Sequence, residues 1–319
     1  MRAPDTPKNE QERLETLRSM NILDTPAEER FDRLTRMAKR MFGVPIALVS
    51  LIDENRQWFK SCVGLDASET SRDISFCGHA ILSNNVLIIP NALQDARFAD
   101  NPMVLGDPNI RFYAGCPLRA PNGSMVGTLC IIDQKPRNFE KDDIEGLKDL
   151  ASMVERELAL VQMATLDELT NISNRRGFMM LAQHCLHLCA REGVCVSLVF
   201  LDLDKLKSIN DKFGHLEGDR ALIAFAELMK TTCRDSDLFA RLGGDEFVAL
   251  LTNTSKQATE EVLARFGQSL EKYNQEANRG YDIQFSYGIV QFDREKHHTV
   301  DHFLAEGDLL MYETKKGKQ

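Results

Sequence analysis

The sequence predicts an α+β protein with two domains, joined by a long helix that dimerises. The chain has 319 residues, which suits two domains of roughly 150 residues each. Hydrophobic residues make up 43% of the chain and charged residues 27%, as in folded globular proteins and not in disordered ones. Helical and strand-like patterns mix in both halves, and an uninterrupted helical pattern separates them.

Four segments follow one another along the chain. We expect a polar lead-in over 1–20, a first domain over 21–138, a connecting helix over 139–166 and a second domain over 167–319. In the first domain, apolar residues at helical spacing predict a helix over 27–42, which Gly43 ends. Strand-like runs follow at 44–52, 57–63, 86–89, 111–118 and 125–132, with a short helix at 76–82 and a hairpin turn at 121–123. This order of elements predicts an α+β fold.

The connecting helix carries a heptad pattern. Its seam residues, spaced alternately three and four apart, are Ile144, Leu147, Ala151, Val154, Leu158, Val161 and Thr165. Such a seam favours a left-handed coiled coil with a second helix. The alternative is an amphipathic helix that packs on its own domain. Because neither Gly nor Pro occurs from 147 to 170, we expect a rigid connector that forms a homodimer.

The second domain alternates helices with strands. We expect helices at 174–190, 205–213, 216–233, 256–277 and 301–316, a strand at 194–203, a hairpin at 238–251 and a strand at 283–290. This pattern predicts a second α/β domain with a central, mostly antiparallel sheet.

Composition excludes several classes of protein. The net charge of −9 is unsuited to a general nucleic-acid-binding protein, which needs Lys and Arg to neutralise phosphates. The longest apolar stretch, 44–52, is far shorter than the ~20 residues of a membrane helix, so we expect no membrane partner. The first residues lack the apolar segment of a secretory signal, and the eight Cys are scattered. We therefore expect a cytoplasmic protein with reduced thiols.

The segment Arg241–Phe247 carries the most informative pattern. Gly243 and Gly244 lie between two strand-like runs, where a tight hairpin turn needs residues that tolerate positive φ. Without side chains, they would also let a ligand approach the backbone closely. Asp245 and Glu246 follow directly. On its own, the segment is more typical of a surface hairpin with solvated acids than of a functional site.

A second acidic pair strengthens the case for a site. The apolar strand 196–201 ends in Asp202 and Asp204, and ligands in open α/β sheets bind at the carboxyl ends of strands. If the hairpin pairs beside this strand, Asp202 and Asp245 converge. Clustered carboxylates without His or Cys suit Mg²⁺, which is commonly held by one or two carboxylates together with substrate phosphates.

These residues resemble the GGDEF-type diguanylate cyclases. The matching segments, which cover about 165–319 in the family's order, are GGDEF at 243–247, DELT at 167–170, DLDKLKSINDKFGHLEGD at 202–219, FSYGIV at 285–290 and Tyr312-x-x-Lys315. The resemblance implies an enzyme that condenses two GTP into cyclic di-GMP and two pyrophosphates. It also implies Mg²⁺ or Mn²⁺, no organic cofactor and a homodimer, because each domain would hold one GTP.

The resemblance further implies a role for each matching residue. Asp202, the carbonyl of Leu203, Asp245 and Glu246 would bind the metal, and Asp245 or Glu246 would help to deprotonate the attacking 3′-hydroxyl. Lys207 and Lys315 would neutralise phosphate charge. Asn210 and Asp219 would bind guanine, with His215 lining the same pocket and Gly243 and Gly244 beside the GTP. Arg234 and Asp237 match the family's inhibitory Arg-x-x-Asp site for the product, against the alternative of an accidental charged turn.

The sequence departs from the family pattern at four places. Asn171 stands where the family usually has Gly, Ile172 where it has Leu, and Leu206 where it has an aromatic residue. The terminal run 315–318, KKGK, is one residue shorter than the common K-x-x-G-R. None of these changes removes an expected metal ligand or guanine contact, although they bear on the catalytic rate.

The first half resembles the GAF sensor family. The likeness lies in 44–61, 75–80, 95–102, 110–118 and 127–133, which are mostly framework residues, so it predicts the fold and leaves the sensor ligand unknown. Cys77 and His79, with Cys62, Cys116 and Cys130, raise the idea of thiol or haem sensing. Free Cys more commonly packs as a small buried hydrophobe.

Two functional hypotheses remain at this point. The first is a diguanylate cyclase regulated by its GAF domain. The alternative is a catalytically weak or inactive module that binds GTP or cyclic di-GMP and signals to a protein partner. The metal carboxylates favour the enzyme, because a pure receptor does not need them.

Overall fold

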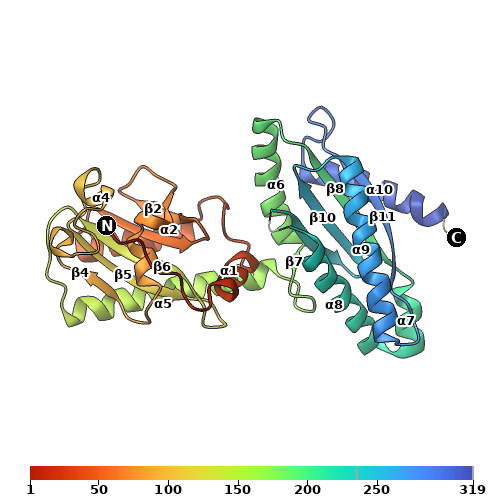
Figure 1. Cartoon of the computed structure of the whole chain (residues 1–319), viewed down its shortest axis with the longest axis horizontal. Helices are drawn as coiled ribbons and strands as arrows, with labels where there is room; N and C mark the ends of the chain where they lie inside the picture. Colours follow the sequence, from red (N-terminus) through yellow and green to blue (C-terminus); the bar gives the residue numbers. More distant parts are fainter. Residues whose placement is uncertain (235, 318–319) are drawn as a thin grey trace. The chain divides into compact units, whose positions relative to one another are not determined.

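The computed structural model describes residues 1–234 and 236–317, apart from the side chains of His187 and Glu192, and forms two compact units. The first unit contains residues 1–163 and the second begins at Ala164 (Figure 1). Both combine helices with a largely antiparallel sheet, which confirms the predicted two-domain α+β class. In the described part of the chain, no helix has both the length and the apolar composition that crossing a membrane requires.

The first unit is built on a six-stranded antiparallel sheet. Its strands, in the order β3-β2-β1-β6-β5-β4, are β1 (Ile46–Ile52), β2 (Arg56–Val63), β3 (Glu69–Ser71), β4 (Leu87–Ile89), β5 (Phe112–Arg119) and β6 (Met125–Asp133). The helices are α1 (Glu10–Ser19), α2 (Glu29–Phe42), α3 (Phe76–Ala80), α4 (Pro102–Leu105) and α5 (Lys141–Thr165), with 3₁₀ turns η1 (Arg72–Ile74) and η2 (Ala92–Gln94).

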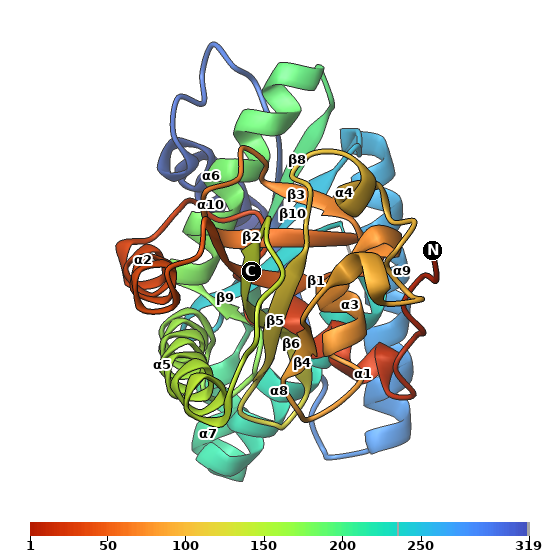
Figure 2. The same ribbon diagram turned by 90° about the vertical axis from the view of Figure 1, so that its left-hand side faces the viewer.

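Both faces of this sheet are buried, because alternate residues of a strand point to opposite sides. On β1, Ala47, Val49 and Leu51 join a core formed with α2 and α5. Ile46 and Leu48 join a second core formed with α3 and α4. Figure 2 shows α2 and α5 together on one side of the sheet and α3 on the other.

The heptad seam of α5 belongs to the core of the first unit. Leu147, Ala151, Val154, Leu158 and Val161 are each at most 5% exposed and pack in the same cluster as α2 and the sheet. The prediction that this seam pairs with a second copy is therefore wrong, and the alternative of an amphipathic helix on its own domain is the one observed. A heptad pattern reports an apolar face and does not identify the surface that covers it.

The second unit is built on a five-stranded sheet in the order β11-β8-β10-β9-β7. Its strands are β7 (Ser173–Asn174), β8 (Val196–Asp204), β9 (Leu238–Gly243), β10 (Glu246–Thr252) and β11 (Gln284–Gln291), and only the short β7–β9 pair is parallel among the described strands. The helices are α6 (Arg175–Glu192), α7 (Leu206–Phe213), α8 (His215–Thr232), α9 (Lys256–Ala277) and α10 (Val300–Gly317).

Strand β8 divides its residues between two cores. Val199, Leu201 and Leu203 pack with α8 and α9, whereas Leu198 and Phe200 pack on the side of α6 and α10. By the same alternation, Asp202 lies on the face covered by α10. The strand register thus places Asp202, the first acid of the expected site, on the face that α10 covers.

The predicted lead-in is part of the first unit, and ionic contacts hold it there. Arg13, on α1, is 1% exposed and donates to the carbonyl of Ile52 at 2.5 Å. The Glu10 carboxylate accepts hydrogen bonds from Arg13 at 2.7 and 2.8 Å and from Arg72 at 2.6 Å. Although burial opposes it, these two guanidinium groups lower the pKa of Glu10 from its ordinary value of 4.5 to about 2.

We expect Glu10→Gln to lower the free energy of unfolding of the first unit by about 2 kcal/mol at pH 7, because it leaves a buried guanidinium uncompensated. A lowered pKa contributes stability above pH 4.5 that is lost as the pH falls toward 2, so the difference from the unmodified protein should shrink over that range. Fluorescence of Trp58, the single Trp of the chain, reports urea unfolding of this unit. Glu12→Gln, on an exposed residue of the same helix, is the control, and equal losses in both variants would contradict the prediction.

Candidate active site

The candidate site begins at the carboxyl end of β8. Asp202 lies opposite Glu246 of β10 on one side and opposite Ser286 of β11 on the other. Directly opposed residues on antiparallel strands have neighbouring side chains on one face of the sheet. Asp204 follows on the same face and accepts a hydrogen bond from the Ser286 hydroxyl at 2.8 Å. The structure therefore brings the two predicted acidic pairs to one edge of the sheet.

The diglycine hairpin adopts the conformation that glycine allows. Gly243 has φ 152° and Gly244 has φ 54°, and a Cβ at either position would meet open space. The tight turn is centred one residue later than predicted, because Gly243 pairs with Glu246 and leaves Gly244 and Asp245 at its tip. A register shift between Glu246 and Phe247 accommodates the difference. The amide of Leu203 donates to the Asp245 carbonyl at 3.0 Å, which ties the tip to the end of β8.

The acids of the site repel one another in a partly buried environment. Burial raises the pKa of Asp202, which is 7% exposed, and the charges of Asp245 and Asp204 raise it further. Burial also raises the pKa of Glu246, followed by the charges of Asp308, Asp245 and Asp202. Raised carboxylate pKa values mark a place where added positive charge is stabilising.

Lys315 supplies part of that positive charge. Its ammonium donates to Asp202 Oδ1 at 2.6 Å. Burial opposes the charged form of Lys315, but the hydrogen bond and charge of Asp202 outweigh it and raise the lysine's pKa. Lys315 thus lies at the carboxylates, although the residues after 317 of the shortened terminal run lie outside the described part of the chain.

The oxygen donors fit a hard divalent cation. Among the described residues, no group of three His, Cys, Asp or Glu side chains is already arranged as a complete metal site. Two carboxylates beside a buried strand end nevertheless match Mg²⁺, which usually completes its shell with waters and substrate phosphates. The absence of nearby His and Cys in the pattern argues against a site selective for zinc.

The residues expected to bind guanine lie together on α7 and α8. Asn210 packs directly on Gly218, where a Cβ would overlap the asparagine amide oxygen. Asp219 follows Gly218, and both Asn210 and Asp219 are half-buried. His215 is exposed at the start of α8. Lys207 is exposed on α7 and has no hydrogen bond or ion pair with the described residues, so it is not brought to the carboxylates in this state.

Three departures from the family pattern have structural explanations. Asn171 has φ 53°, a left-handed conformation that Asn tolerates better than most residues, so it replaces the family's Gly without changing the backbone. Ile172 is 3% exposed and Leu206 is 9% exposed, and both pack in the core with α8 and α9. These three residues fill structural positions in the second unit.

A link from the start of the second unit to the hairpin was not predicted. Arg241 Nη1 donates to Asp167 Oδ1 at 3.0 Å, and Arg241 Nε and Nη2 donate to the carbonyl of Gly244 at 3.0 and 2.8 Å. Asp167 also accepts from the Thr170 amide and hydroxyl at 2.9 and 2.7 Å. The DELT segment contained both ends of this turn, but nothing in its spacing pointed to Arg241, 74 residues away.

Of the two residues expected to bind the inhibitory product, Arg234 and Asp237, only one has an exposed side chain. Arg234 is exposed, whereas Asp237 is half-buried and its carboxylate accepts from the amides of Arg234 at 2.9 Å and Thr252 at 3.2 Å. Asp237 therefore shapes the turn between α8 and β9 and leaves the Arg234 side chain at the surface. Residue 235 lies outside the described part of the chain.

The cysteines singled out in the first unit pack in its interior. Cys77 and Cys130 are both 2% exposed or less, with their sulfur atoms 3.6 Å apart, and the Tyr113 hydroxyl donates to Cys77 at 3.3 Å. Cys116 is buried and Cys62 is half-buried. His79 contacts the carbonyl of Arg2 at 3.0 Å.

Comparison with known proteins agrees with this division of the chain. The family model described as "Diguanylate cyclase, GGDEF domain" matches residues 164–319, and the GAF domain model matches residues 26–158. A microbial GGDEF domain solved with cyclic di-GMP is 30% identical, with a TM-score of 0.43, and the match covers 48% of this chain and 94% of that one.

Several curated proteins are similar to this chain. The Pseudomonas aeruginosa protein named cyclic di-GMP phosphodiesterase PA2567 is 31% identical over 91% of this chain, which spans 49% of that protein. Diguanylate cyclase DgcP of Escherichia coli is 30% identical over 78% of this chain and 76% of its own length. Diguanylate cyclase A of Treponema denticola is 29% identical over 63% of this chain and 56% of its own length. The chain thus spans about half the length of the first and third of these relatives.

We expect Asp167→Asn to loosen the diglycine hairpin, because it removes the charge that orients Arg241 against the Gly244 carbonyl. Hydrogen exchange measured by mass spectrometry should be about tenfold faster over 238–252, if roughly 1–2 kcal/mol of local stability is lost. Glu168→Gln changes the exposed neighbouring acid and should leave that exchange unchanged. Identical exchange in the two variants would show that the ion pair does not hold the hairpin.

Proposed function

Because the chain belongs to the GGDEF family and carries a GAF domain before the GGDEF domain, we propose that it is a diguanylate cyclase. In this proposal a homodimer condenses two GTP into cyclic di-GMP and two pyrophosphates. The observation that carries it is the meeting of Asp202 with Glu246 at the end of β8, where Lys315 is already bound to one carboxylate. A domain that only received a ligand would have no need of this repulsive acidic pair.

Asp202, Asp245, Glu246 and the carbonyl of Leu203 would hold Mg²⁺ or Mn²⁺. When bound, the metal would neutralise triphosphate charge and favour departure of pyrophosphate. Burial and the charges of neighbouring carboxylates raise the pKa values of Asp202 and Glu246, so a cation bound beside them would be stabilised.

The chain's own residues would perform the proton transfer. The 3′-hydroxyl of one GTP attacks the α-phosphorus of the other, the new oxygen–phosphorus bond forms, and the bond to the pyrophosphate oxygen breaks. Asp245 or Glu246 would accept the hydroxyl proton.

Lys315 and Lys207 would stabilise the phosphate charge. Lys315 lies on Asp202 at 2.6 Å, so it could turn to a phosphate once a cation takes its place at that carboxylate. Lys207 is exposed on α7 and would approach only when nucleotide is bound. Positive charge that acts on the pentavalent transition state is the main contribution a protein makes to phosphoryl transfer.

Asn210 and Asp219 would select guanine over adenine. Asn210 packs on Gly218, the residue directly before Asp219. An amide and a carboxylate together can satisfy the guanine edge, whereas adenine would leave polar groups unpaired. His215 would line this pocket, and the open space beside Gly243 and Gly244 would admit the phosphates.

The cyclic product requires two GGDEF domains that face each other, so the homodimer is part of the proposal. The heptad seam of α5 is buried in the first unit and cannot join the copies. Dimer contacts would then use other surfaces, and the GAF domain would regulate activity by changing how the two cyclase domains meet.

We expect the purified protein to convert GTP into cyclic di-GMP and pyrophosphate when Mg²⁺ is present, and Asp245→Asn to lower kcat at least ~100-fold because a charged ligand and base is lost. Chromatography of the products measures both. Asp282→Asn, an exposed acid of the same unit, is the matched control.

Two outcomes of that experiment would reject a cyclase: no cyclic product, and hydrolysis of added cyclic di-GMP without synthesis. The second would agree instead with the name of the P. aeruginosa relative. Full activity in Asp245→Asn would mean that the metal is held elsewhere.

We expect Arg234→Ala to weaken inhibition by added cyclic di-GMP about 10- to 100-fold, because an exposed guanidinium that forks onto the product contributes one or two charged hydrogen bonds. Calorimetric titration with cyclic di-GMP measures the binding independently of turnover. Arg294→Ala, another exposed arginine of this unit, should bind as the unmodified protein does. Unchanged binding in Arg234→Ala would place the inhibitory site elsewhere.

A further inference from the structure

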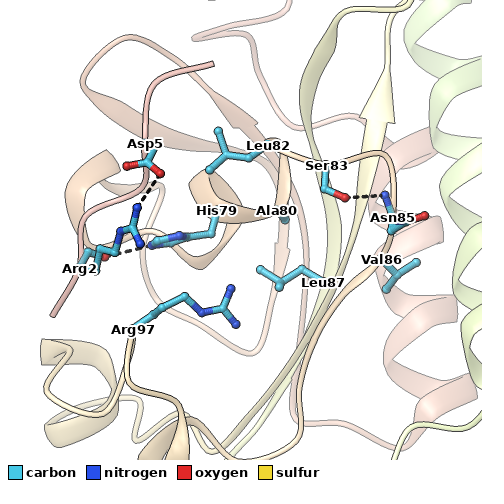
Figure 3. A pocket seen from close by; sticks show the side chains of 10 residues that line it. All are labelled: Arg2, Asp5, His79, Ala80, Leu82, Ser83, Asn85, Val86, Leu87 and Arg97. Atoms are coloured by element: carbon cyan, nitrogen blue, oxygen red, sulfur yellow. Dashed lines mark hydrogen bonds and ion pairs between the residues drawn. The ribbon is translucent and has the colours of Figure 1, made fainter. Parts of the chain in front are cut away.

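A pocket of about 290 Å³ opens in the first unit (Figure 3). It lies beside α3 and β4, and Arg2 and Asp5 from the N-terminal segment form one side. Arg2 and Arg97 contribute guanidinium groups, His79 an imidazole, Asp5 a carboxylate that is paired with Arg2, Asn85 an amide, and Leu82 and Leu87 apolar wall. Figure 3 shows the Arg97 side chain reaching into the space between His79 and Leu87.

One buried aromatic ring positions the Arg97 guanidinium and the His79 imidazole. Phe98 is 1% exposed and stacks on Phe76 with ring centroids 4.0 Å apart. The His79 ring meets Phe98 edge-on at 4.9 Å, and the guanidinium carbon of Arg97 lies 5.1 Å from the centre of the Phe98 ring. Both groups are thus oriented before any ligand arrives, which reduces the entropy lost on binding.

Arg97 keeps a donor directed away from its own carboxylate partner. Asp95 accepts from Arg97 Nε at 2.9 Å and from Nη2 at 2.7 Å. Within the described residues, Nη1 of Arg97 has no hydrogen-bond partner. Asp95 therefore fixes the plane of the guanidinium and leaves one edge for a second anion, the geometry by which arginine recognises carboxylates and phosphates.

The first residues of the chain bring a second guanidinium to the same place. The amide of Arg2 donates to the Arg97 carbonyl at 3.1 Å, and the Arg2 carbonyl contacts His79 Nε2 at 3.0 Å. The Arg2 side chain is 66% exposed and donates through Nη2 to Asp5 at 2.8 Å. Its other guanidinium nitrogens are without a partner in the described part of the chain, so one carboxylate does not saturate it.

The charges and the apolar walls of the pocket favour the same class of ligand. Burial lowers the pKa of His79 and the positive charges of Arg97 and Arg2 lower it further, while its contact with the Arg2 carbonyl and the charge of Asp5 oppose them. Leu82, 40% exposed, and Leu87 offer apolar surface next to the donors. The volume is at the lower end of the ~300–1,000 Å³ that small-molecule sites occupy.

We infer that this pocket binds a small organic anion, with a carboxylate or phosphate held by Arg97 and Arg2 and a short apolar body against Leu82 and Leu87. The inference does not rest on the cyclase proposal, because none of its residues belongs to the second unit. It assigns a class of ligand to the first unit, whose ligand the sequence left unknown.

The test is a calorimetric titration of the full chain with valerate, valeramide and inorganic phosphate at matched ionic strength. We expect saturable binding of valerate and none of its neutral amide. Tighter binding of phosphate than of valerate would identify a phosphorylated ligand, and the reverse order a carboxylic acid, both in agreement with the site. No saturable binding of either anion, or equal binding of valerate and valeramide, would overturn the inference.

Two variants test the residues. Arg97→Gln should weaken binding of the anion at least about tenfold, the effect of losing a charged hydrogen bond. Arg2→Gln changes an exposed side chain that folding does not need, and should weaken binding in the same direction. Arg33→Gln, an exposed arginine on α2, is the control and should bind as the unmodified protein does. Unchanged affinity in both pocket variants, with Trp58 fluorescence showing a folded first unit, would place the anion elsewhere.

Discussion

The register between β8 and β10 is the constraint on which the candidate site depends. It sets Asp202 opposite Glu246, and the Leu203–Asp245 backbone hydrogen bond of 3.0 Å closes the hairpin onto the same strand end. A slip of one residue would turn Asp202 toward the apolar core formed with α8 and α9. The buried apolar residues of β8 on both faces resist that slip. Packing of the sheet interior therefore holds together two carboxylates that repel each other.

Contacts between residues far apart in sequence reduce the free-energy cost of bringing these carboxylates together, but they do not remove it. Lys315 reaches Asp202 from α10, 113 residues away in sequence, and Arg241 joins the hairpin to Asp167. The pKa of Asp202 stays raised despite Lys315, because burial outweighs it, and burial with the charges of Asp308, Asp245 and Asp202 raises the pKa of Glu246. The clustered carboxylates lower the local stability of the strand end, as is expected where a protein binds a charged ligand.

The sequence predicted those features that depend on local pattern. Alternation and apolar runs identified β8 and β10, and the GGDEF segment identified the acids at their junction. Features that depend on which surface covers a residue could not be predicted in this way. The seam of α5 is apolar at Leu147 and Val154 whether a second copy or the GAF sheet lies against it. The Asp167–Arg241 pair and the pocket beside His79 arise from segments that only tertiary structure brings together.

The same contacts connect the end of α5 to the diglycine hairpin, and the proposed regulation could use this short path. α5 ends at Thr165 with its apolar seam fixed in the first unit, and Leu166 already bridges Ser173 in the second. The next residue, Asp167, holds Arg241, whose other donors hold the Gly244 carbonyl at the hairpin tip. A displacement of the end of α5 that moved Asp167 would strain its bonds with Thr170 and Arg241. Hydrogen bonds and one ion pair hold the hairpin tip, and such contacts resist small movements less than a packed core does. The hairpin is therefore the part of the second unit that would move first.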